Sequence, residues 1–218
     1  SRPVAPAGCR CRRTGRQPVG SFAVVDGEPA YRISAYHRMP PFLMSVATDT
    51  DLWMFIASSG GLTAGRVDAE GVLFPYETVD KLYEAHRHTG PVTLIRARRG
   101  KDESLLWQPF ADETAGAPHI ERHLYKNTAG NRVVFEEINR DLDLVFRYRW
   151  AGCDELGWVR TATLENRGAK PAAVSLLDGL RNITPYGAPL AMHQQFSSLI
   201  DAYKRTDCDP DTGLAIYS

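Results

Sequence analysis

The residues best suited to chemistry form a histidine, glutamate and histidine pattern in the middle of the chain. If residues 120–125 are extended, His119, Glu121 and His123 project from one face, because alternate residues of a strand point the same way. Two imidazoles and a carboxylate are suitable metal ligands. The polar face of an ordinary sheet has the same spacing, and three groups on one strand need a further ligand from elsewhere. We therefore expect no metal and no other cofactor.

Paired carboxylates are the second candidate chemistry, because glycoside hydrolysis needs two carboxyl groups that face each other roughly 5 to 10 Å apart. Glu136 and Glu137 are adjacent, so in a strand they point to opposite faces and at most one of them enters a cleft. Asp141 and Asp143 share a face with arginines, which favours a solvated ladder of charges. The chain contains no nucleophile elbow, phosphate loop or dinucleotide fingerprint. We predict no catalytic residue.

Candidate contacts to a sugar or to another domain gather in two segments. In residues 51–81, aromatic-rich apolar runs break at Gly60-Gly61 and at Gly65-Arg66, and such glycines cost stability unless a close contact needs them. In residues 176–187, an arginine, an amide and a tyrosine follow a buried strand, as in many polar ligand sites, although a structural crossover needs the same turn residues. The predicted contact residues are Arg66, Tyr76, Asp80, Lys81, Arg181, Asn182 and Tyr186.

The composition is typical of a globular domain with a sizeable core, since 43% of the 218 residues are hydrophobic and 24% are charged. Positive and negative side chains number 26 each, so no overall charge attracts nucleic acid. No apolar stretch approaches the roughly 20 residues that cross a bilayer. We therefore expect no nucleic-acid or membrane partner, and a cytoplasmic location in which the four cysteines stay reduced.

The N-terminal end differs from the rest of the chain. It carries arginines among Pro, Ala and Gly without the apolar region of a secretory signal. We predict that residues 1–18 are a disordered basic tail, or an artefact of cloning or of the assigned start site. Residues 19–218 are predicted to form one β-sandwich domain.

Short strands separated by turn residues dominate from Ser21 onward, which predicts a mainly β sandwich. The clearest strand is 141–150, where apolar residues alternate with charged ones. Two short helices are expected, one after Thr78 and one at 196–203, and a last strand begins near Leu214, so that the sheet is incomplete at its C-terminal end. The other expected strands are 21–25, 31–34, 42–48, 52–57, 92–97, 120–125, 132–138, 158–165 and 172–177.

Several segments together resemble the N-terminal region of proteins related to cellobiose phosphorylase, and more loosely that of related glycoside hydrolases. The segments are MPPFLMSV (39–46), DLWMFIASSGGLTAGR (51–66), LFPYETVDK (73–81), LYKNTAGNRVVFEEINRDLDLVF (124–146), LLDGLRNITPYG (176–187) and SSLIDAYK (197–204). In that family this region is a β-supersandwich, similar to galactose mutarotase, joined to an (α/α)6 barrel that carries the catalytic carboxylic acid. The chain shows no run of long amphipathic helices, so the resemblance implies a domain whose barrel is missing.

Three hypotheses follow for the function. The first is a non-catalytic carbohydrate-binding or structural domain of a glycoside phosphorylase or hydrolase acting on β-glucosides or gluco-oligosaccharides, with an oligosaccharide and the missing barrel as partners. The second is a carbohydrate-binding module that works alone, with Trp53, Trp107 or Trp158 as exposed stacking platforms. The third is a mutarotase-like sugar epimerase that uses a His and Glu pair from residues 119–123.

Overall fold

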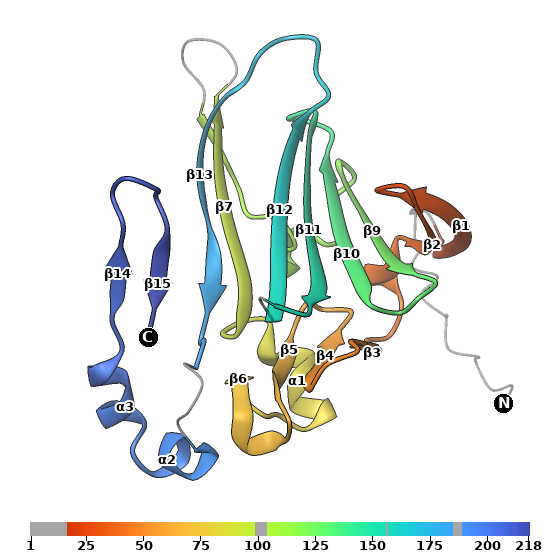
Figure 1. Cartoon of the computed structure of the whole chain (residues 1–218). Coiled ribbons are helices and arrows are strands. Elements are labelled where there is room, and N and C mark those ends of the chain that lie inside the picture. Colours follow the sequence, from red (N-terminus) through yellow and green to blue (C-terminus); the bar gives the residue numbers. More distant parts are fainter. Residues whose placement is uncertain (1–16, 99–103, 156, 185–188) are drawn as a thin grey trace, which may run out of the picture.

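The computed structural model describes residues 17–98, 104–155, 157–184 and 189–218. Its fold is mainly β and sandwich-like, as predicted, and is built from antiparallel sheets (Figure 1). The largest sheet has six strands in the order β1 (Val19–Val25), β2 (Glu28–Ser34), β9 (Ile120–Asn127), β10 (Arg132–Asn139), β11 (Leu144–Cys153) and β12 (Gly157–Asn166).

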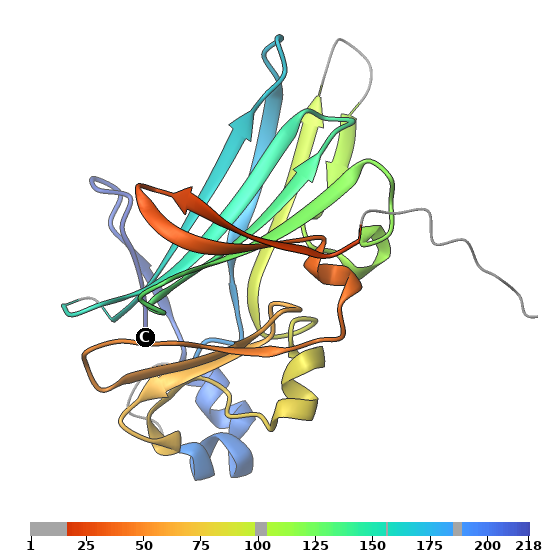
Figure 2. The ribbon, with the colours of Figure 1, turned by 90° about the vertical axis from the view of Figure 1, so that its right-hand side faces the viewer.

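The remaining strands form three smaller sheets. A three-stranded sheet has the order β13 (Ala173–Arg181), β7 (Gly90–Arg98) and β8 (Ser104–Trp107). A four-stranded sheet consists of β3 (Leu43–Val46), β4 (Leu52–Ala57), β5 (Leu62–Arg66) and β6 (Val72–Phe74), and it crosses beneath the long strands in Figure 2. The hairpin of β14 (Thr206–Cys208) and β15 (Ala215–Tyr217) lies close to the C-terminus.

The helices are short. The α-helices are α1 (Val79–Ala85), α2 (Leu190–Gln195) and α3 (Ser197–Tyr203), and the 3-10 turns are η1 (Tyr36–Arg38), η2 (Ala69–Gly71) and η3 (Asp112–Thr114). The sequence predicted α1 and α3 and missed α2, whose six residues carry little periodic signal. No helix in the described ranges is long and apolar enough to cross a bilayer.

One hydrophobic core joins the three larger sheets. Met54 and Ile56 enter it from β4, Ile95 from β7, and Phe146 and Trp150 from β11. The edge-to-face contact of Phe74 with Trp150 joins the four-stranded sheet to the largest one. The core therefore fixes the end of β11 against the smaller sheets, where the candidate site lies.

The alternation expected for 141–150 is confirmed from Leu144 onward, because Leu144, Phe146, Tyr148 and Trp150 are all buried. The strand itself begins three residues later than predicted. Asp143 has a positive φ of 46°, which ends any extended conformation there. The predicted ladder of aspartates is therefore wrong, since those residues lie in the turn between β10 and β11.

The glycines in residues 51–81 are explained by turns and close contacts within the domain. Gly60 has a φ of 95° in the turn between β4 and β5, and a Cβ atom on Gly61 would lie 2.1 Å from the carbonyl oxygen of Leu82 in α1. The predicted break at Gly65 and Arg66 falls at the end of β5, which includes both residues and ends at Arg66, and the pairing of β5 with β6 shifts register between Ala64 and Gly65. Gly65 instead provides space for the ring of Trp53, which would lie 2.6 Å from an added Cβ atom.

Candidate functional site

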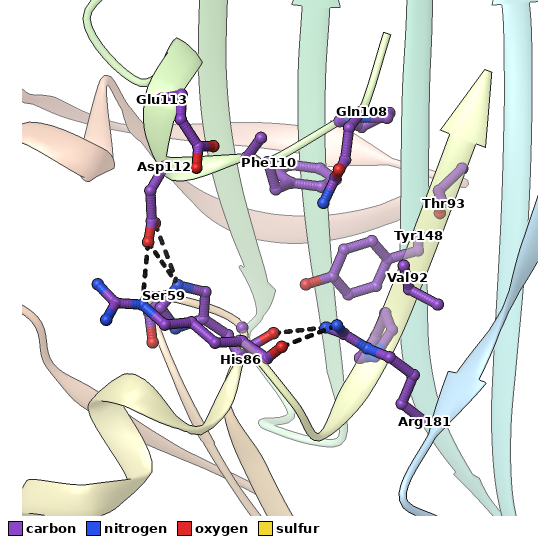
Figure 3. A pocket seen from close by; sticks show the side chains of 15 residues that line it. Ser59, His86, Val92, Thr93, Gln108, Phe110, Asp112, Glu113, Tyr148 and Arg181 are labelled. Carbon is purple, nitrogen blue, oxygen red and sulfur yellow. Dashed lines mark hydrogen bonds and ion pairs between the residues drawn. The ribbon is translucent and has the colours of Figure 1, made fainter. Parts of the chain in front are cut away.

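A half-open polar pocket of about 280 Å³ lies where the three-stranded sheet meets β11 (Figure 3). Four parts of the chain surround it: the β4–β5 turn, the residues that follow α1, the segment 108–113 with η3, and the lower ends of β7 and β13. The lining side chains used below are Ser59, His86, Arg87, Thr93, Gln108, Phe110, Asp112, Glu113, Tyr148 and Arg181.

One wall of the pocket carries an ion-pair cluster around Asp112. The Nε2 atom of His86 lies 3.1 Å from both carboxylate oxygens, and Nε of Arg87 donates to Asp112 over 3.4 Å. Burial raises the pKa of Asp112, but the hydrogen bonds and charges of His86 and Arg87 together outweigh that effect, so the pKa lies below its usual value. Asp112 therefore offers a carboxylate to the pocket at neutral pH.

Arg181 forms another wall, and it is one of the predicted contact residues. Its guanidinium donates to the carbonyl oxygen of Arg87 over 2.8 Å and to that of His86 over 2.6 Å (Figure 3). These carbonyl groups lie just beyond the end of α1, where a cation is favourable. Arg181 thus ties the end of β13 to the residues after α1.

Two aromatic rings form the base of the pocket. Phe110 and Tyr148 pack edge to face with ring centroids 5.2 Å apart, and the Tyr148 hydroxyl points into the pocket (Figure 3). Only 3% of Tyr148 is exposed, and burial raises its pKa well above the usual value. None of the hydrogen bonds between the described residues involves this hydroxyl, so it can bond to a ligand.

The segment 108–113, which carries Asp112 and is called the wall segment below, is held in place by a buried acid. Glu137 is fully buried and accepts hydrogen bonds of 2.7 Å each from Trp107 Nε1, the Phe110 backbone N–H and Arg122 Nε. Arg122 also donates to the carbonyl oxygen of Ala111 over 2.6 Å. This network stabilises Phe110 at its positive φ of 65°, a conformation that an aromatic residue rarely adopts.

The tryptophans do not form the exposed platforms that the second hypothesis requires. Trp107 is buried with only 3% of its surface exposed, so its proposed stacking role is wrong. Trp53 is partly buried, and its Nε1 donates to the carbonyl oxygen of Asp68 over 3.1 Å. Trp158 is partly buried and packs against the core.

The predicted contact residues are distributed over three pockets. Arg181 lines the pocket of Figure 3, whereas Arg66 lines a pocket of about 400 Å³ and is paired with Asp51 at 3.1 Å. Tyr76, Lys81 and Asn182 are brought together in a third pocket of about 360 Å³, formed between α1, α2 and α3.

Two of the predicted residues stand apart from these pockets. Asp80 lines none of them, and a hydrogen bond from Thr78 lowers the pKa of its carboxyl group. Tyr186 lies outside the described residues.

Asn182 has a positive φ of 57° and donates to the hydroxyl of Thr89 over 3.0 Å, so its side chain also supports the turn after β13.

The histidine and glutamate pattern does not form one cluster. His119 precedes β9 and lies 3.5 Å from Asp141, whereas Glu121 pairs with Arg140 at 2.8 Å. His123 contacts Arg32 at 3.0 Å, and its Nε2 atom lies 4.0 Å from Glu121, so only Glu121 and His123 of the three are neighbours. Within the described part of the chain, no three His, Cys, Asp or Glu side chains are placed to hold a metal ion.

The residues of the pocket in Figure 3 were largely missed from sequence. Asp112 lies in a segment without periodic signal, and only its fold places it beside His86. Tyr148 did carry a signal, because it is the hydroxyl-bearing member of a buried apolar stripe and a buried hydroxyl needs a partner.

The adjacent Glu136 and Glu137 are both buried, with Glu136 accepting hydrogen bonds from Tyr125 and Arg147.

The fold and the site together define a mainly β protein of antiparallel sheets, with a polar pocket between the sheets whose base is formed by two aromatic rings. Comparison with protein-family models and with curated proteins gave no match.

Proposed function

We propose that this chain is a non-catalytic carbohydrate-binding domain, and that the pocket of Figure 3 holds one sugar unit. In this proposal it is the N-terminal domain of a glycoside phosphorylase or hydrolase that acts on β-glucosides or gluco-oligosaccharides. The sugar would enter between the charged walls and the aromatic base, and the rest of an oligosaccharide would extend out of the open side toward a catalytic barrel.

The observation that carries this proposal is the composition of the pocket around Tyr148. A sugar ring needs donors and acceptors for its hydroxyl groups and an apolar surface for its C–H groups. Arg87 and Gln108 supply donors, Asp112 supplies acceptors, Tyr148 supplies a hydroxyl group, and Phe110 supplies ring surface. The volume of about 280 Å³ lies near the lower end of ligand pockets, which fits one ring rather than a chain of them.

The carboxylates of the pocket support a binding role rather than glycosidic cleavage. Asp112 and Glu113 are adjacent in η3 and so belong to one wall, whereas hydrolysis requires two carboxyl groups on either side of the scissile bond. Asp112 is also engaged by His86 and Arg87. Among the described residues that line the pocket, no acid faces them from the opposite wall.

Calorimetric titration with methyl β-glucoside, cellobiose and cellotriose tests the proposal. We expect weak binding by the chain alone, with similar affinities for the three ligands because one ring occupies the pocket. Tyr148→Phe removes only the hydroxyl and should weaken binding about fivefold, the equivalent of one hydrogen bond worth about 1 kcal/mol. Tyr31→Phe, on the exposed side of β2, is the matched control and should bind as the original does. Absence of binding, or an equal loss in both variants, would contradict the proposal.

A further inference from the structure

A further cavity, of about 750 Å³ and larger than the three pockets above, lies beside η1 and the first residues of β9. It shares no lining residue with the pocket of Figure 3. Strands β2 and β9 form its base, and the backbone N–H of Ala35 donates to the carbonyl oxygen of Arg122 over 2.8 Å, which closes η1 against β9. The cavity is therefore independent of the sugar pocket in position.

The side chains that face this cavity carry an excess of positive charge. Three arginines line it, Arg32, Arg38 and Arg122, against a single carboxylate, Glu121. Glu137 neutralises Arg122 from within the core at 2.7 Å, and Arg140 neutralises Glu121 at 2.8 Å. Two guanidinium groups, those of Arg32 and Arg38, thus remain without a counter-charge from the other lining residues.

The contacts of these two arginines are those expected of an anion-binding site. Arg32 lies 3.0 Å from Nε2 of His123 and 5.8 Å from the centre of the Tyr125 ring, and its Nε atom is buried without a hydrogen-bond partner in the described ranges. Arg38 is exposed, lines the cavity and forms no ion pair with the described residues. Guanidinium groups bind phosphate and carboxylate oxygens through parallel hydrogen bonds.

His37 reports the same positive field. Burial, which has the largest effect, and the charges of Arg122, Arg38 and His123 together lower the pKa of its ring to about 4. Its Nδ1 atom is buried and has no hydrogen-bond partner among the described residues. The other charged groups that line the cavity with His37 are Arg32 and Glu121.

We propose that this cavity binds a small organic anion, whose phosphate or carboxylate group is held by Arg32 and Arg38. The apolar body of the ligand packs on Val19, Pro118 and Ile120, which line the same space. Neither group belongs to the proposed sugar pocket, so the anion site stands whether or not that pocket binds a sugar.

Calorimetry with four probes tests the site: phenyl phosphate, benzoate, inorganic phosphate and the neutral benzyl alcohol. Phenyl phosphate carries a phosphate group and benzoate a carboxylate, so the comparison of these two probes distinguishes the two anionic groups. We expect phenyl phosphate, benzoate or both to bind more tightly than inorganic phosphate and benzyl alcohol. Arg32→Gln and Arg38→Gln should each weaken that binding about tenfold, because each removes a charged hydrogen-bond donor. Arg132→Gln, on the same sheet and paired with Glu28, is the matched control and should change nothing.

A second measurement separates binding from folding defects. In the unmutated chain, NMR titration of the His37 ring should show its pKa rising from about 4 when the organic anion is bound, because the anion offsets the neighbouring positive charges. An unshifted His37, equal binding of benzyl alcohol, or an equal loss in all three arginine variants would overturn the proposal.

Discussion

At the scale of single residues, the pocket depends on groups that never touch a ligand. Glu137 has no exposed surface, yet it holds Trp107, Phe110 and Arg122, which together fix the wall segment. A buried acid with three donors is satisfied as a carboxylate, and its neighbour Arg122 supplies the counter-charge at 2.7 Å. The pair therefore links the stability of the core to the shape of the site.

Replacing Glu137 by Gln should lower the free energy of unfolding by about 3 to 5 kcal/mol, because Arg122 would stay buried without its counter-charge. Urea unfolding measures this loss directly. The matched control is Glu28→Gln, which breaks a much more exposed pair with Arg132 and should cost less than about 1 kcal/mol. Similar losses in the two variants would show that the buried network has no special role.

The lowered pKa of Asp178 leads to a predicted dependence of stability on pH. Burial raises the pKa of its carboxyl group, but hydrogen bonds from Arg160 and Thr93 and the charge of Arg160 outweigh that effect, so the folded pKa lies below the ordinary value. A depressed carboxyl pKa stabilises the fold above the unfolded pKa of about 4, and the contribution is lost as the pH falls through the folded pKa.

We therefore expect the urea midpoint to fall in acid below about pH 4. Asp178→Asn should lower the midpoint at neutral pH and flatten its fall in acid, since one of the titrating groups is then gone. Asp26→Asn, which breaks an exposed pair with Arg149, is the control and should leave the slope nearly unchanged. An acid slope that is identical in Asp178→Asn and in the unmutated chain would refute the argument.

At the scale of elements, the sequence predicts what depends on local pattern and misses what depends on distant neighbours. The buried stripe of β11 follows from alternation alone, and α1 follows from helical spacing. Strand β5 was missed because Gly65 reads as a break, whereas it fits there to accommodate Trp53 from β4. The pocket of Figure 3 was missed for the same reason, since its walls come from four separated parts of the chain.

The contact between α1 and the β4–β5 turn yields a prediction at this scale. A Cβ atom on residue 61 would lie 2.1 Å from the carbonyl oxygen of Leu82, and backbone cannot give way as a flexible side chain does. Gly61→Ala should therefore lower the free energy of unfolding by about 1 to 3 kcal/mol. Gly179→Ala in β13 meets no atom within 4 Å and should leave urea unfolding unchanged or slightly stabilise it. A neutral result for Gly61→Ala would mean that α1 can move away freely.

At the scale of the whole molecule, the sheet order could not be read from the sequence. Neighbours such as β9, β10 and β11 are consecutive hairpins, so their pairing follows from chain order. The pairing of β2 with β9 and of β7 with β13 joins segments that lie far apart in the chain, as in the pairs Ala30–Asn127 and Gly90–Arg181, and no local pattern specifies it. The mainly β class was predictable, whereas the family resemblance and the barrel partner remain predictions.

The position of β13 leads to the last prediction, which concerns association. β13 is the outer strand of its sheet, and Leu176 and Leu177 are exposed on its two opposite faces at 50% and 64%. An apolar strand with unpaired backbone groups at a sheet edge favours pairing with another chain. The purified chain should therefore self-associate as its concentration rises, and sedimentation velocity measures this. Leu177→Lys should reduce the association, whereas Leu199→Lys on the exposed side of α3 should not, because a helix offers no free strand edge. A chain that stays monomeric at every concentration would contradict the argument.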